Sequence, residues 1–157
     1  MVYGCVFFYR WIFFFPDLWY FSTIGIPFND SVNWRLTIAE KAQQILGDNL
    51  LGLQAGNEPD FYAMFVHPPS IFSSIFSSKF ETWLLRNGHR PSTYGPQDYA
   101  NDVGNLIKAM EADSGIPNKN MLICPSVATG AWTPELVWDT GFINTYGSYL
   151  TALAVEQ

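Results

Sequence analysis

The sequence has few of the features that mark metal, nucleic-acid or dinucleotide sites. Cys5 and Cys124 lie far apart, and no Cys-x-x-Cys spacing occurs, so we predict neither a disulfide nor a metal site. Only 8 Lys and Arg residues stand against 14 Asp and Glu residues, and the net charge of −6 disfavours nucleic acid or an anionic membrane as partner. No Gly-x-Gly-x-x-Gly follows a predicted strand. We therefore expect no cofactor.

A long hydrophobic run is also missing, although a membrane-spanning helix needs about 18–20 apolar residues. Residues 1–23 form an aromatic N-terminal segment, but Arg10 interrupts its apolar part and Pro16 breaks it. No small-residue cleavage site follows, so a signal peptide or anchor is not favoured and no membrane partner is expected. Two other interpretations remain open: an aromatic flap packed on a neighbour, or sequence that is not native coding sequence.

What the chain does have is an alternation of strand and helix patterns. Short apolar runs predict strands, and apolar residues at helical spacing predict helices. The predicted strands are 24–28, 50–55, 121–124 and 151–155, and the predicted helices are 34–46, 97–112 and 133–146. We expect Asn33 or Ser31 to cap the first helix, Thr133 to cap the third, and Pro125 to end the third strand.

This order, with strands apolar on both faces, predicts an α/β fold with a parallel sheet. An open doubly wound sheet and an incomplete (β/α)8 barrel are the two alternatives. At 157 residues the chain is shorter than the roughly 200 residues of a complete barrel. Both alternatives stay open at this point, and in the second the barrel is a partial one over residues 24–157.

A Phe- and Ser-rich insertion at residues 64–86 interrupts the alternation. It contains the near-repeat Ile71-Phe-Ser-Ser74 and Ile75-Phe-Ser-Ser78 and matches neither a helix nor a strand pattern. A loop of more than about 15 residues is uncommon inside a compact domain. Translated non-coding sequence and a genuine hydrophobic lid are both left open.

The strongest candidate site follows the predicted strand 50–55. The strand ends in Asn57-Glu58-Pro59, and catalytic residues of (β/α)8 barrels lie at such strand ends. We expect Pro59 to hold Glu58 in extended backbone, with Glu58 as a proton donor and Asn57 as a ligand for a sugar hydroxyl. Asn29 begins a glycosylation sequon, but we predict that it ends a strand and faces the pocket instead.

Glycoside hydrolysis generally needs a second carboxyl group, and the sequence offers no convincing one. We expect Asp60 to face the loop, because it is too close to Glu58 in sequence. Glu135 is better explained as a first-turn helix residue, favoured by the helix dipole. Glu156 follows the last strand and can point into a barrel mouth or belong to a frayed end.

Other polar and aromatic candidates have simpler explanations. His67 lies in the insertion, and His89 lies in a loop where a structural role is favoured. Ser126 lacks the Gly-x-Ser-x-Gly elbow of a hydrolase triad. Trp132 and Trp138 can stack on a sugar, but aromatic residues near a helix more often belong to the core.

Several longer strings carry a resemblance to a known family. They are Gly25-Ile-Pro-Phe-Asn-Asp30, Asn33-Trp-Arg-Leu36, Gly47 to Tyr62, Gly88-His-Arg-Pro-Ser-Thr-Tyr-Gly-Pro96, Cys124-Pro-Ser-Val-Ala-Thr-Gly130, Trp132-Thr-Pro-Glu135 and Leu150 to Glu156. Through them the chain resembles the fungal members of glycoside hydrolase family 79, the β-glucuronidase-like enzymes related to heparanase. The Asn-Glu-Pro element alone is shared by a wide clan of barrel glycosidases.

The resemblance implies a (β/α)8 barrel followed by a small β domain, a retaining mechanism and a carbohydrate substrate. It maps Glu58 onto the general acid/base and Asn57 onto its substrate-binding neighbour. The chain then supplies about strands three to six of the barrel. The nucleophile of the family, a Glu near the end of strand seven, falls beyond Gln157. Family members are secreted, whereas the sequence does not assign a compartment to this chain.

Three functions follow as hypotheses. The first is a portion of a retaining glycosidase, which we expect to be inactive on its own because the nucleophile is absent. The second is a non-catalytic carbohydrate-binding remnant. The third is a small membrane-associated protein anchored by residues 1–21.

Overall fold

The computed structural model describes residues 22–28, 32–63, 90–128 and 130–155. The predicted insertion at 64–86 lies outside these residues, as does nearly all of the predicted N-terminal segment 1–23. Ser22 and Thr23, the last two residues of that segment, belong to the first strand of the fold.

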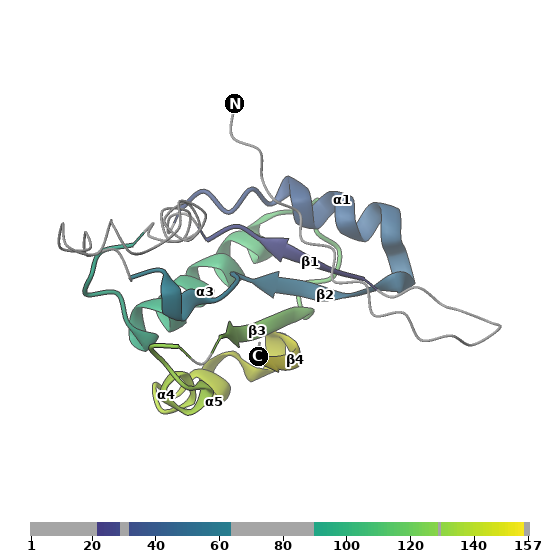
Figure 1. The fold of residues 1–157 in the computed structure, drawn as a ribbon. Helices are drawn as coiled ribbons and strands as arrows, with labels where there is room; N and C mark the ends of the chain where they lie inside the picture. The colour runs from purple at the N-terminus through teal and green to yellow at the C-terminus, as the bar shows by residue number, and fades with distance from the viewer. Residues whose placement is uncertain (1–21, 29–31, 64–89, 129, 156–157) are drawn as a thin grey trace, which may run out of the picture.

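Four parallel strands form one sheet in the described part of the chain, in the order β1-β2-β3-β4. The strands are β1 (Ser22–Ile26), β2 (Leu50–Ala55), β3 (Leu122–Val127) and β4 (Leu150–Val155). The arrows of β1, β2 and β3 share one direction in Figure 1, and β4 pairs parallel with β3, so the carboxyl ends meet at one edge of the sheet. The predicted α/β class with a parallel sheet is confirmed.

Helices connect these strands. They are α1 (Thr37–Leu46), α3 (Pro96–Ala112), α4 (Pro134–Trp138) and α5 (Phe142–Tyr146), together with the short 3-10 turns η1 (Gly47–Asn49), η2 (Pro59–Phe61) and η3 (Gly147–Tyr149). The α1 helix packs on β1 and β2, and α4 packs on β3 and on α3 (Figure 1). The Tyr99 hydroxyl of α3 donates to the Ala55 carbonyl of β2 at 2.8 Å, which fastens this helix to the sheet.

The α3 helix follows directly from its sequence. Pro96 occupies the first turn, and the Gly95 amide donates to the Asp98 carboxylate at 2.9 Å, so the helix start is capped. Its apolar stripe is buried and consists of Tyr99, Val103, Leu106, Ile107 and Met110. This stripe packs into the core together with Leu53, Ala55, Leu122 and Cys124 of the sheet.

The two faces of the sheet differ within the described residues. Paired residues on parallel strands point to the same face. Ile26 and Ala55 are paired and buried, as is the pair Leu53 and Leu122. The alternate residues are more open, since Gly25 is exposed and its partner Gln54 is half-buried. The second face is therefore more open at the Gly25–Gln54 pair, although Leu50 and Gly52 on the same face of β2 are buried.

The first predicted helix begins later than expected. It starts at Thr37 with Leu36 as the N-cap and no side-chain cap, so Asn33 does not cap it, and Ser31 lies outside the described residues. The cause lies just upstream, because Trp34 is buried against Phe28 at a ring distance of 4.8 Å. Arg35 then takes a positive φ of 48°, which delays the helix.

Two further boundaries differ from the sequence prediction. The predicted helix 133–146 is broken into α4 and α5 by Gly141, whose φ of 80° is a left-handed conformation typical of a helix end. Thr133 precedes α4 without a side-chain cap bond to the helix backbone. The third strand continues through Pro125, which pairs with Ala154, and a register irregularity before Val127 accommodates the proline.

Candidate functional site

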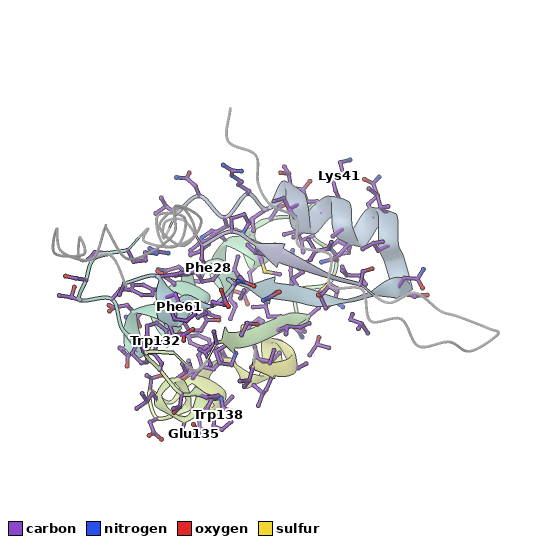
Figure 2. All side chains as sticks on the ribbon, viewed as in Figure 1. Phe28, Lys41, Phe61, Trp132, Glu135 and Trp138 are labelled. Carbon is purple, nitrogen blue, oxygen red and sulfur yellow. The ribbon has the colours of Figure 1, made fainter. Side chains whose placement is uncertain are left out.

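The candidate site lies where β1, β2 and β3 end. The Gly56 amide donates to the Ile26 carbonyl at 3.3 Å, and the Glu58 amide donates to the Ser126 carbonyl at 3.0 Å. The segment after β2 is therefore bonded to the ends of both neighbouring strands. This edge is where ligands bind in parallel α/β sheets. Phe61 and Trp132 lie at this side of the molecule, away from Lys41 on the outer helix α1 (Figure 2).

Glu58 stands at the centre of this edge, but its backbone differs from the prediction. Its φ of 49° and ψ of 56° are left-handed, not extended. Pro59 does exclude right-handed helical geometry from Glu58, as expected. The left-handed turn is instead fixed by the bond to Ser126 and by the Phe61 amide, which donates back to the Glu58 carbonyl at 2.9 Å.

The surroundings of Glu58 shift its carboxyl group toward the protonated form, relative to a free glutamate. Partial burial raises its pKa above the ordinary value, and the negative charge of Asp60 raises it further. A carboxyl group that acts as a general acid needs a shift in this direction, because it must hold a proton near neutral pH. Since the folded-state pKa is the higher one, ionisation of Glu58 lowers the stability of the fold as the pH rises.

Asn57 is held on two sides. Its backbone amide donates to the Tyr62 hydroxyl at 2.9 Å, and its side-chain oxygen accepts from the Gln54 amide at 3.3 Å. Gln54 lies on the more open face of the sheet, so this contact links the strand to the site. With its oxygen engaged as an acceptor, Asn57 presents N–H donors to a ligand.

Asp60 has a structural position that the sequence analysis did not predict. We expected it to face the loop, but its side chain is fully buried at 0% exposure. Its two carboxylate oxygens accept from the Ala128 amide at 2.9 Å and the Gly130 amide at 2.8 Å. It therefore joins the turn after β2 to the segment after β3. A short Asp-containing turn carries no local pattern that reveals a partner 70 residues away.

The alternative sites have structural roles wherever the structure describes them. Trp132 is buried between Tyr94 and Tyr99, at ring distances of 5.9 and 6.3 Å, as the core explanation predicted. Glu135 is exposed in the first turn of α4, and a hydrogen bond from Thr133 lowers its pKa. Trp138 is half-buried on the same helix.

Ser126 is 1% exposed, has a positive φ of 52°, and holds Glu58 through its carbonyl. Its burial removes it as a hydrolase nucleophile. The substrate-binding prediction for Asn29, the second-carboxylate candidate Glu156, and both His67 and His89 lie outside the described residues. Of the predicted site residues, the structure thus describes Asn57 and Glu58, which are neighbours in the sequence.

A buried ion pair behind the site was also missed by the sequence analysis. Arg90 lies 2.7 Å from Asp102 of α3, both side chains are 7% exposed, and the Tyr94 hydroxyl donates to Asp102 at 2.9 Å. Burial and the charge of Asp102 raise the pKa of Tyr94, which keeps it a hydrogen-bond donor. The Arg90 amide also donates to the Tyr62 carbonyl at 3.3 Å, so the backbone beside this pair is bonded to the residue that follows the Pro59–Phe61 turn.

Cys124 is a buried free cysteine on β3. Burial raises its pKa to about 12, so the thiol stays protonated and unreactive at neutral pH. Burial likewise raises the pKa of Tyr99 beside it. In the described ranges no group of three or more His, Cys, Asp or Glu residues is arranged to hold a metal ion. Nor does any helix of the described chain have the length and apolarity to cross a membrane.

Comparison with known proteins identifies no relative. No family model matches the chain, and neither the curated proteins nor the solved structures contain a match.

Proposed function

We propose that this chain forms part of the barrel of a retaining glycoside hydrolase that acts on β-glucuronides, with Glu58 as the general acid/base. The observation that carries the proposal is the position of Glu58: a carboxyl group with a raised pKa, held at the carboxyl ends of parallel strands. Asn57, fixed beside it, is the proposed ligand for a sugar hydroxyl.

The strand order supports a barrel over a doubly wound sheet. Doubly wound sheets reverse their strand order at a switch point, whereas the order here runs β1-β2-β3-β4 without reversal. Right-handed crossovers in an unreversed order place all connecting helices on one face. The buried face and the more open face of the sheet agree with this arrangement, since the inner face of a barrel is closed by further strands.

The proposed chemistry assigns Glu58 two proton transfers. As an acid it gives its proton to the glycosidic oxygen while a second carboxylate attacks the anomeric carbon, and as a base it later takes a proton from water. Asp60 cannot be that second carboxylate, because both its oxygens are bound to backbone amides and it is fully buried. The proposal therefore places the nucleophile outside the described residues.

Binding of a β-glucuronide tests the proposal. Titration of the purified chain with methyl β-glucuronide, followed by NMR, should perturb the amides of Asn57 and Glu58. The variant Asn57→Ala should weaken binding by about fivefold, since one hydrogen bond is worth about 1 kcal/mol and 1.4 kcal/mol is tenfold. The matched control is Asn101→Ala, which removes an exposed amide side chain of α3 and should leave affinity unchanged.

An aryl β-glucuronide assayed on the same samples should be bound but not hydrolysed. Turnover abolished by Glu58→Gln but not by Glu135→Gln would show that the nucleophile is present after all, while keeping the acid/base assignment. Affinity that is equal in the wild type and in Asn57→Ala, or no affinity at all, would contradict the proposed site.

A further inference from the structure

The turn that carries Glu58 is held in an unfavourable backbone conformation. A left-handed backbone is unfavourable for a non-glycine residue and persists only when surrounding contacts fix it. Glu58 has this conformation, and the 3-10 turn Pro59–Phe61 follows it immediately. The bond from the Tyr62 amide to the Pro59 carbonyl, at 3.1 Å, closes this turn. Asp60 is its middle residue.

Asp60 fastens this turn to the end of β3. Both its oxygens are used, one on the Ala128 amide and one on the Gly130 amide. The approach at Gly130 is close, because a Cβ there would collide with the ring of Phe61 and lie 3.1 Å from the Asp60 carboxylate. A carboxylate that accepts backbone N–H bonds makes strong, charge-assisted contacts. The turn after β2 therefore cannot move independently of the segment after β3.

The same carboxylate acts on Glu58 through its charge. The bonds that hold Asp60 come from neutral amides, and among the described residues it takes part in no ion pair. A like charge nearby disfavours a second ionised carboxyl. Partial burial is the larger cause of the raised pKa of Glu58, and the negative charge of Asp60 is the second.

We propose that Asp60 is the positioning residue of this site: bound to the Ala128 and Gly130 amides, it fixes the Glu58 turn against β3 and places its carboxylate beside the Glu58 carboxyl. Its role rests on the proposed function of Glu58. Asp60 itself touches no substrate, because it is fully buried. It acts through Glu58, by fixing where the carboxyl lies and by favouring its protonated form.

The variant Asp60→Asn tests this role. Asparagine keeps one acceptor oxygen but removes the charge and one of the two amide bonds. The pKa of Glu58, measured by carbon NMR titration, should fall toward the ordinary value, and exchange of the Ala128 or Gly130 amide should accelerate about tenfold or more. The control Asp98→Asn alters an exposed carboxylate that only caps α3 and should leave the pKa of Glu58 unchanged.

An unchanged Glu58 pKa in Asp60→Asn would overturn the proposal. If this variant does not fold, through-hydrogen-bond coupling between the Asp60 carboxyl carbon and the Ala128 and Gly130 amide nitrogens can be measured in the wild type. Detection of this coupling supports the two hydrogen bonds to Asp60, and its absence overturns the proposal. None of these readouts needs a sugar, so a failure to bind β-glucuronide counts against the proposed function alone.

Discussion

The variant Asp102→Ala should lower the free energy of unfolding by about 3–5 kcal/mol, as breaking a buried ion pair generally does. It would leave the buried Arg90 guanidinium without its carboxylate partner at 2.7 Å, and the Tyr94 hydroxyl without its acceptor. Urea unfolding measures the loss as a lower midpoint at an unchanged slope.

The control for this experiment is Asp98→Ala on the same helix. Asp98 is exposed and only caps the helix start through the Gly95 amide, so its loss should cost about 1 kcal/mol. Equal small losses for both variants would contradict a stabilising role of the buried Arg90–Asp102 pair.

The variant Phe142→Ala should lower the free energy of unfolding by about 3–5 kcal/mol, the usual cost of removing a buried aromatic ring. Phe142 is 1% exposed and stacks on Tyr99 of α3 at 6.1 Å, with Tyr146 edge-on at 5.5 Å. Phe142 therefore connects α5 to α3, the helix whose Tyr99 is bonded to the sheet. Thermal or urea unfolding gives the loss.

The neighbouring variant Ile143→Ala is the matched control, because Ile143 is 37% exposed on the same short helix. Its effect should be about 1 kcal/mol or less. If Phe142→Ala were equally mild, α5 would not pack on α3, and the helical layer over the sheet would be wrong.

The elements predicted well from the sequence are those with strong local patterns. The strand Leu50–Ala55 has the predicted bounds, and the helix Pro96–Ala112 differs from the prediction by one residue at its start. The strand is an apolar run and the helix carries an apolar stripe at helical spacing, each between clear start and stop residues, so short-range rules describe them. The position of Asn57 and Glu58 at a strand end follows from the same patterns.

The remaining features depend on contacts between distant segments. The bonds of Asp60 join residues 68 and 70 positions apart, and no local pattern encodes them. The left-handed Glu58 is likewise fixed by Ser126 of another strand, which overrides the extended conformation expected before a proline. Pro125 stays within β3 because the ladder shifts register around it, which a sequence pattern does not show.

The most direct test of the central claim is the carbon NMR titration of the Glu58 and Glu135 carboxyl groups in the wild-type chain, with and without methyl β-glucuronide. Glu58 should titrate above its ordinary value and Glu135 below it. The sugar should raise the pKa of Glu58 further, because it brings its own carboxylate, and should leave Glu135 unchanged. A Glu58 that titrates no higher than Glu135 and does not respond to the sugar would contradict the account.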